Sequence, residues 1–322
     1  MQKQTNKYLK ISSATLLAMT MGLTGCQTVK SLTGGKKSTV VASAEKPASA
    51  YYSSALKNID DRNFNAAIES LKSIRDFYPR SQYAPKALLD IMYVHYTKKD
   101  YVEAATAAEE FIILYPADPQ VDYAYYVRGL AHMQSTTKKF NLVKPNPAKR
   151  DTAAYRLGFK NLLEFVSMYP NSKYAPDAAQ HMTYIYNTLA EQELQVARWY
   201  IKRKAYLAAA KRANSTFQYF PRSESVPEAI ATLAYSNDKL GLTDLANQYK
   251  TLLQINYPEW LDSNGDVKLN NTKASLINRL TFGKLGRASE INNTHYNGRY
   301  NGQTRTQLIQ NAAQLRLPAN AN

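Results

Sequence analysis

The stretch FNAAIESLKSIRDFYPRSQYAP, residues 64–85, decides the fold class of this chain. The small side chain of Ala67 lets two helices approach closely, and the aromatic Phe64 one turn earlier fills the space beside it. Pro79 ends a helix, because proline cannot continue one and restricts the residue before it. Pro85 falls in the first turn of a following helix, where no backbone N–H is needed. The stretch therefore predicts the second helix of one hairpin, a turn and the start of the next hairpin.

The same arrangement recurs four more times along the chain. An aromatic residue is followed by proline, with spacings of 37, 54, 51 and 37 residues, at Tyr78-Pro79, Tyr115-Pro116, Tyr169-Pro170, Phe220-Pro221 and Tyr257-Pro258. Twelve residues before each proline the side chain is small, at Ala67, Ala104, Gly158, Ala209 and Ala246. Repeats of about 34–37 residues with this pattern resemble the tetratricopeptide repeat (TPR), a helical hairpin that stacks into a superhelix with a concave groove.

These repeats predict an all-α fold, a superhelical array of five TPR-like helix–turn–helix units in residues 48–258. A flexible N-terminal tether and a basic C-terminal extension flank the array. The predicted repeats lie at about 48–84, 85–119, 120–174, 175–225 and 226–258.

The two long spacings locate departures from the regular repeat. The third repeat carries an insert, STTKKFNLVKPNPAKR at 135–150, which predicts a protruding loop. The fourth repeat has an unusually long first helix, from about Pro176 to Tyr200, and Lys202–Lys204 then occupy the turn between its helices. Ser225 and Glu228 fit a capping box at the start of the fifth repeat.

Residues 1–25 predict a cleaved lipoprotein signal peptide. Three lysines precede an uncharged, mostly apolar stretch at 11–23, which is too short to span a bilayer. The following Leu-Thr-Gly-Cys resembles the bacterial lipobox, so we expect Cys26 to be lipidated and to begin the mature chain. Gln27, in place of Asp, favours the periplasmic face of the cell outer membrane, and residues 26–47 read as a flexible tether. Cys26 is the only cysteine, which excludes an intramolecular disulfide.

The chain is basic, and its C-terminal part is the most biased. Removing the three lysines of the signal peptide from the formal +16 leaves +13, a charge that favours anionic lipid, lipopolysaccharide or acidic partners. Nucleic acid is not expected for an exported chain. Residues 259–322 are basic and Asn-rich and predict a largely disordered extension, with a short helix at about 273–285. Asp262–Asp266 resembles the start of a calcium loop, but Lys273 stands where the bidentate acid belongs, so a simple Asn-Gly turn is favoured.

Residues 51–258 resemble the BamD family, the TPR lipoproteins of the outer-membrane β-barrel assembly (BAM) machinery. The resemblance rests on the DYAYYVRGL helix at 122–130, the Pro-bearing insert and the run ELQVARWYIKRKAY at 193–206, in the family's order. The tail after residue 258 departs from the shorter members. The resemblance implies a non-catalytic scaffold without a cofactor, apart from the covalent lipid. Its C-terminal repeats would dock a POTRA-bearing barrel subunit, its N-terminal repeats would receive C-terminal strands of unfolded outer-membrane proteins, and small BAM lipoproteins would complete the complex.

Two sets of candidate site residues follow from this resemblance. Arg203 matches the family arginine that contributes to the contact with the barrel subunit, and Lys202 and Lys204 flank it; the ordinary alternative is a solvated turn. Aromatic and polar side chains of the N-terminal groove would hold an extended peptide, while aromatics at helical spacing more often form core. The candidates for this groove are Tyr51, Tyr52, Arg62, Tyr93 and Tyr96. The basic loop 138–150 is a further candidate for contact with a partner or lipid headgroups.

No catalytic or metal-binding pattern is visible in the sequence. The four histidines, at 95, 132, 181 and 295, lack metal-ligand spacing, and no nucleophile elbow, zinc-protease motif or phosphate loop occurs. Two other functions stay open. A periplasmic TPR factor of cell-wall or Tol–Pal coordination shares the Tyr-Pro-x-Ser-x-Tyr-Ala signature but usually has a coiled-coil N-terminus. A peptidoglycan hydrolase would need paired carboxylates in a cleft.

Overall fold

The computed structural model describes residues 46–135, 148, 152–269 and 304–318. In these ranges the regular structure is helical, and the only β feature is a single bridge between Leu261 and Val267. The predicted all-α repeat fold is confirmed. Cys26, most of the basic loop 138–150 and the helix predicted at 273–285 lie outside the described residues.

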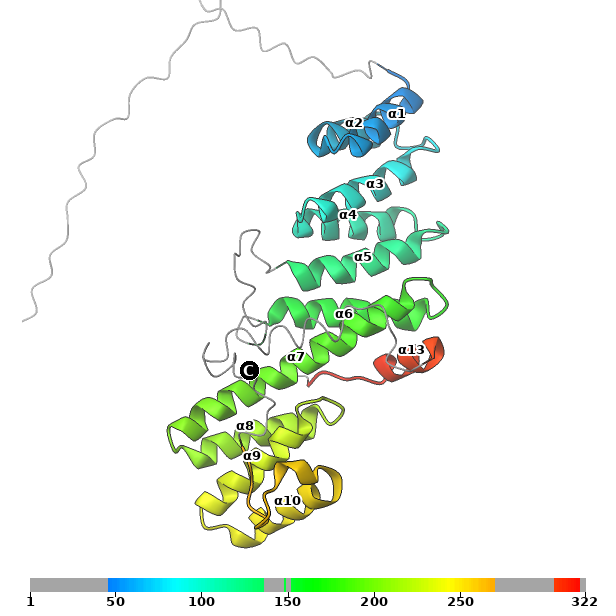
Figure 1. Cartoon of the computed structure of the whole chain (residues 1–322). Helices are drawn as coiled ribbons and strands as arrows, with labels where there is room; N and C mark the ends of the chain where they lie inside the picture. Colours follow the sequence, from blue (N-terminus) through cyan, green and yellow to red (C-terminus); the bar gives the residue numbers. More distant parts are fainter. Residues whose placement is uncertain (1–45, 136–147, 149–151, 270–303, 319–322) are drawn as a thin grey trace, which may run out of the picture. The chain divides into compact units, whose positions relative to one another are not determined.

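Ten helices form five antiparallel hairpins, and each helix contacts the next along the chain (Figure 1). The first helices of the hairpins are α1 (Ala48–Asp60), α3 (Ala84–Thr97), α5 (Val121–Gln134), α7 (Ala175–Lys202) and α9 (Val226–Lys239). The second helices are α2 (Phe64–Phe77), α4 (Tyr101–Leu114), α6 (Ala153–Met168), α8 (Tyr206–Tyr219) and α10 (Thr243–Asn256). Beyond them come the short 3-10 helix η2 (Pro258–Trp260) and helix α13 (Arg305–Ala313).

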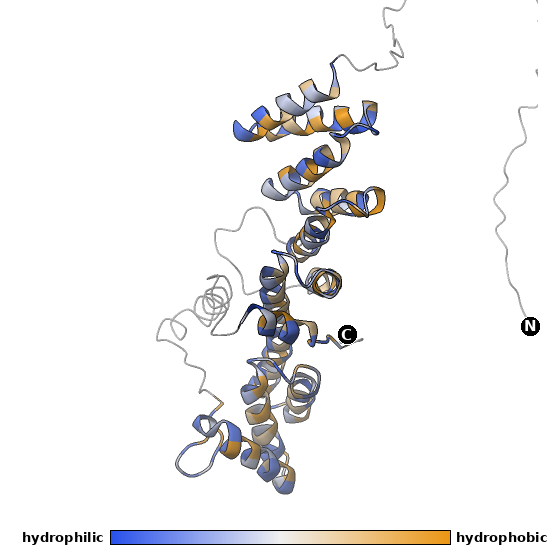
Figure 2. Ribbon diagram, turned by 90° about the vertical axis from the view of Figure 1, so that its right-hand side faces the viewer, coloured by the Kyte–Doolittle hydropathy of each residue, from blue (hydrophilic) through white to orange (hydrophobic). Residues whose placement is uncertain are grey.

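Small residues at one register position allow the two helices of each hairpin to pack closely. Ala67, Ala104 and Ala209 are fully buried, and Ala246 is almost so. At the same position of α6, a Cβ atom added to Gly158 would stand 2.8 Å from Met133 Cβ and 2.9 Å from its Cα. The helices are amphipathic, and Figure 2 shows apolar and polar residues interleaved along them. The core is therefore a series of clusters between neighbouring helices, as expected of a repeat array.

The aromatic-proline pairs end the second helices as predicted. Tyr78, for example, directly follows α2, and its N–H donates to the carbonyl of Ile74, four residues earlier. Pro85, Pro176 and Pro227 lie in the first turns of α3, α7 and α9. The capping box predicted at Ser225 is wrong, because no side chain caps α9. Glu228 binds Arg198 of α7 in its place.

The turns inside the hairpins need a left-handed residue. In four of the five hairpins it lies two residues after the first helix, and its φ is +58° at Arg62, +65° at Lys99, +58° at Lys204 and +75° at Gly241. Residues with a Cβ adopt this conformation at a cost. Arg62, Lys99 and Lys204 thus adopt a left-handed conformation that glycine usually provides.

Helix α7 has 28 residues, whereas its hairpin partner α8 has 14. The C-terminal end of α8 reaches the middle of α7, where the Tyr186 and Phe220 ring centroids are 5.2 Å apart. The N-terminal half of α7 therefore extends beyond α8. Helix α13 packs there, against α7 and α6.

The prediction of a largely disordered extension is wrong for the described parts of residues 259–322. Residues 304–318 include α13, whose Leu308, Ile309, Ala312 and nearby Leu315 are buried. Residues 258–269 form η2 and a turn in which the Gly265 N–H donates to the carbonyl of Asp262, with a φ of +78° at Gly265. This turn agrees with the sequence-based choice of a simple turn over a calcium loop. The polar composition of the segment favours disorder, and composition alone does not show that its few apolar residues, Leu308, Ile309, Ala312 and Leu315, fall on one face of a helix.

Candidate partner-binding sites

An exposed tryptophan and arginine lie together at the end of α7. Trp199 is 48% exposed, and the Arg203 guanidinium carbon stands 4.0 Å from the centre of its ring. Lys202, Arg203 and Lys204 are all exposed, and Tyr200 packs edge-on against Trp199 with ring centroids 5.0 Å apart. Trp, Tyr and Arg are the residue types that contribute most often to binding energy at protein interfaces. We call Trp199, Tyr200 and Lys202–Lys204 the Trp199 patch.

A buried ion cluster fixes the helix end that carries this patch. Arg198 Nη1 donates to Glu191 Oε1 at 2.7 Å, and Arg198 Nη2 donates to Glu228 Oε2 of α9 at 2.7 Å. Burial alone would lower the pKa of the Arg198 guanidinium, but the attraction and hydrogen bonds of the two carboxylates outweigh it and raise the pKa. The arginine therefore ties α7 to α9 one residue before Trp199.

The predicted groove residues are only partly brought together. Tyr52 packs at a tilt against Tyr83 with ring centroids 5.3 Å apart, and its hydroxyl lies near the side chain of Asp90. Tyr93 is 45% exposed on α3, the helix that carries Asp90.

The other predicted groove residues have different roles. Tyr51 and Tyr96 are half-buried against the core, and the Tyr96 ring packs edge-on against Tyr101. Arg62 lies beyond the far end of α1 from Tyr52, about 15 Å along the helix at 1.5 Å per residue. It serves as the left-handed residue of the first turn.

Further tyrosines continue the row from α3 to α5 and α7. Tyr174 stacks on Tyr126 with centroids 4.9 Å apart and planes 10° apart, and it lies 5.2 Å from Tyr123. Burial is the largest cause that raises the pKa of Tyr123 to about 12, and the negative charges that Tyr174, Tyr93 and Asp90 carry when ionised add to it. We call this set the tyrosine stripe: Tyr52, Tyr83, Asp90, Tyr93, Tyr123, Tyr126 and Tyr174.

Asp90 is the unusual member of the stripe. Burial raises the pKa of its carboxyl group, and the hydrogen bond from Tyr52 offsets only part of that effect. Its Oδ2 atom is buried and accepts no hydrogen bond. The stripe thus contains a buried acceptor whose hydrogen-bonding capacity is not satisfied within the described residues. Asp90 and Tyr123 were missed from the sequence, although Tyr123 lies in the family segment 122–130.

The raised pKa of Asp90 predicts a pH effect on stability. The folded chain holds the Asp90 proton more tightly than the unfolded chain, so protonation of Asp90 stabilises the fold. This stabilisation is complete below the unfolded pKa of about 3.9 and is lost as pH rises through the folded pKa. We expect Asp90→Asn, which cannot ionise, to gain stability relative to the native chain as pH rises from 4 to 7. Urea denaturation across this range measures the difference. Asp60→Asn, at an exposed position, is the matched control, and parallel profiles for Asp90→Asn and the native chain would contradict the expectation.

Among the described residues no group of three His, Cys, Asp or Glu side chains is placed to hold a metal ion. Within the same residues no helix has both the length and the apolar character needed to cross a membrane.

Comparison with known proteins identifies the family. Residues 44–252 match the family model YfiO, described as outer membrane lipoprotein. The outer membrane protein assembly factor BamD of Neisseria meningitidis serogroup A is 32% identical over 76% of this chain and 91% of its own length. The chain belongs to the BamD family. BamD of Haemophilus influenzae is 30% identical over 77% of this chain and 91% of its own length.

A solved structure adds little to this assignment. The crystal structure of MamA protein covers 64% of this chain and 90% of its own chain at 15% identity, with a TM-score of 0.29. That score is too low to support an argument. The assignment therefore rests on the sequence matches, and the matched segment, 44–252, contains both the tyrosine stripe and the Trp199 patch.

Proposed function

We propose that the protein is an outer-membrane protein assembly factor, a non-catalytic scaffold of the β-barrel assembly machinery. Membership of the BamD family carries this proposal, since the curated relatives bear that description. The chain sits on the periplasmic face of the outer membrane and binds the POTRA-bearing barrel subunit and the small BAM lipoproteins.

The Trp199 patch is the proposed docking site for the barrel subunit. It presents a half-exposed indole under a guanidinium, held on a helix end that the Arg198 cluster fixes. An arginine stacked in this way has lost part of its rotamer freedom before binding and keeps its donors for a carboxylate of the partner. The patch lies in the fourth repeat, in agreement with docking through the C-terminal repeats.

The tyrosine stripe is the proposed receptor for the C-terminal strand of an unfolded outer-membrane protein. Its rings offer flat surfaces for the aromatic side chains of such a strand. Tyr93, exposed on the helix that carries Asp90, offers a side chain that an extended peptide laid along the stripe can contact. The stripe spans the first four hairpins, and so it lies mostly in the N-terminal repeats.

The docking proposal is tested by pull-down of a tagged chain from mildly solubilised outer membranes, with partners identified by mass spectrometry. We expect Trp199→Ala and Arg203→Glu each to reduce recovery of the POTRA-bearing subunit about tenfold, because each removes more than 1 kcal/mol of binding. The circular dichroism spectrum stays that of the native chain. Arg80→Glu, an exposed arginine in the turn between α2 and α3, is the matched control and keeps full recovery.

Two results would contradict the docking proposal. Unchanged recovery with both variants would remove the Trp199 patch from the interface. Recovery of Tol–Pal or peptidoglycan-linked proteins alone, even with the native chain, would favour the cell-wall factor over the assembly factor.

The lipid anchor is proposed at Cys26, at the end of the lipobox-like Leu23-Thr24-Gly25-Cys26. We expect Cys26→Ala to move the protein from the membrane fraction to the soluble fraction after a salt wash, because the covalent lipid is lost. Fractionation and immunoblotting measure the change, with Cys26-containing native chain as the reference. A variant that stays on membranes after the wash would show that another part of the chain anchors it.

A further inference from the structure

The N-terminal half of α7 presents an apolar face that its own hairpin does not cover. The Thr216 hydroxyl of α8 donates to the carbonyl of Ala190, and Phe220, just after α8, packs on Tyr186. Residues 175–185 therefore lie beyond the reach of α8. Ala175 and Ala179 in this half are nevertheless fully buried.

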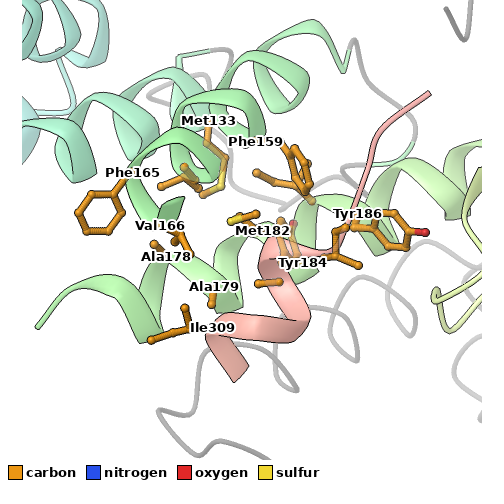
Figure 3. Close-up of a cluster of buried hydrophobic side chains, with 14 of the residues drawn as sticks. Met133, Phe159, Phe165, Val166, Ala178, Ala179, Met182, Tyr184, Tyr186 and Ile309 are labelled. Carbon is orange, nitrogen blue, oxygen red and sulfur yellow. The ribbon is translucent and has the colours of Figure 1, made fainter. Parts of the chain in front are cut away.

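Together with α6, which also packs against α7, helix α13 covers this face. Its Leu308, Ile309 and Ala312, with Leu315 after its end, belong to the same buried cluster as Ala175, Ala178, Ala179 and Met182 of α7. Figure 3 shows Ile309 beside Ala178 and Ala179. The row of alanines makes the surface of α7 flat enough for a second helix to approach closely.

Polar contacts fix the direction in which α13 lies. Thr304 and Gln307 form a reciprocal capping box at its start. Arg305 Nη2 donates to the carbonyl oxygen of Ser172, in the turn between α6 and α7, at 2.7 Å. The N-terminal end of α13 is thereby fastened beside the start of α7.

The formation of α13 depends on this docking. A helix of nine residues is too short to be stable in water by itself, because nucleation costs more than a few hydrogen bonds return. Arg305 and Ser172 are 133 residues apart, and residues 270–303 separate the segment from the rest of the described chain. The segment therefore joins the array as a separately connected ligand rather than as the next helix of the stack.

We propose that the N-terminal half of α7, with the adjoining part of α6, is a helix-docking face, and that residues 304–318 are its reversible ligand, carried on the same chain. The face selects a short amphipathic helix with apolar residues at positions 1, 2, 5 and 8 and a basic residue before them, here Arg305. It lies at the opposite end of α7 from the Trp199 patch, and it adjoins the tyrosine stripe, because Tyr126 and Tyr174 pack against the same buried cluster.

A labelled peptide of residues 304–318 tests the proposal on the full chain. In the native chain the face is occupied, so the added peptide competes poorly. The double variant Leu308→Asp with Ile309→Asp releases the tethered segment without altering the face. We expect this variant to bind the peptide at least tenfold more tightly than the native chain, as measured by fluorescence anisotropy.

Matched controls separate docking from charge. Gln310→Asp with Asn311→Asp adds the same two charges on the exposed side of α13, and this chain should behave like the native one. A peptide carrying Leu308→Asp and Ile309→Asp should bind neither chain. Equal binding of the native peptide to the native and the released chain, or no binding to the released chain, would overturn the proposal.

A second measurement leaves both the face and α13 unchanged. A protease site inserted between residues 270 and 303 is cut after the full chain has folded, and the products are separated by gel filtration. We expect the fragment with α13 to elute with the array at high concentration and to separate on dilution. Separate elution at every concentration would overturn the proposal, as would a fragment that no dilution or excess peptide removes.

Discussion

Arg198→Met is expected to lower the free energy of unfolding by about 3–5 kcal/mol, the cost of breaking a buried ion cluster by removing one partner. The side chains of Glu191 and Glu228 are only 8% and 7% exposed. Met retains most of the volume and removes the charge, so two buried carboxylates lose the guanidinium between them. Because Arg198 joins α7 to α9, we expect the last hairpin to open first.

Urea denaturation followed by circular dichroism measures the loss, and hydrogen exchange of α9 and α10 shows where it begins. Arg212→Met is the matched control, because the structure pairs Arg212 with the single carboxylate of Glu193, at 3.1 Å, and its side chain is 39% exposed against 28% for Arg198. A partly exposed pair of this kind contributes about 0–1 kcal/mol. Adding Glu191→Gln to Arg198→Met should recover part of the loss. Equal effects of Arg198→Met and Arg212→Met would mean that the cluster is solvated in solution.

Gly158→Val is expected to cost about 3 kcal/mol, at the upper end of the range for overpacked cores. The added Cβ would meet not only Met133 Cβ but also its Cα and N, at 2.9 Å each. A backbone cannot rotate away as a side chain can, so α5 and α6 must move apart. The gain in helix propensity over glycine is smaller than this cost.

A smaller change at the same position, Gly158→Ala, should have a smaller effect than Gly158→Val. Gly129→Ala, on the facing helix α5, is its matched control. A Cβ at Gly129 would stand 2.6 and 2.8 Å from Cδ2 and Cγ of Leu162 but 3.3 Å from its backbone N, so the severe part of this clash is with a side chain and not with backbone. Thermal and urea denaturation should therefore rank Gly158→Val as the most damaging, then Gly158→Ala, then Gly129→Ala. The reverse order for the two alanine variants would show that α5 and α6 are not held by close backbone contact.

The repeat array could be predicted because its determinants are local. Each aromatic-proline pair and each small residue twelve positions earlier reports its own hairpin, and five copies make the pattern unmistakable. Helix α13 could not be inferred from composition, since its energy comes from a surface more than a hundred residues away. Its signal was nevertheless present, in the capping-box pair Thr304 and Gln307 followed by apolar residues at helical spacing.

The candidate sites were predictable only in part. Arg203 is predictable from the family pattern, whereas its ring partner Trp199, in the same run 193–206, carries no signal of its own in the sequence. Asp90 carries no local signal, because its importance arises from burial beside Tyr52. The spacing of Ser225 and Glu228 predicts a capping box, but in the folded chain Glu228 pairs with Arg198 of α7. Sequence spacing reveals neighbours along a helix, whereas these contacts join different hairpins.

Because of its length, α7 joins two hydrophobic clusters of the array. Its first half contributes Ala178 and Met182 to one hydrophobic cluster, and its last turns contribute Leu194 and Ala197 to another. No glycine or proline interrupts it after Pro176, so it has no ready point at which to bend over about 42 Å. The tyrosine stripe and the Trp199 patch therefore lie at the two ends of one continuous helix, with Tyr174 directly before its start and Trp199 in its last turn. A change in the direction of this helix at one end would change the position of the side chains at the other.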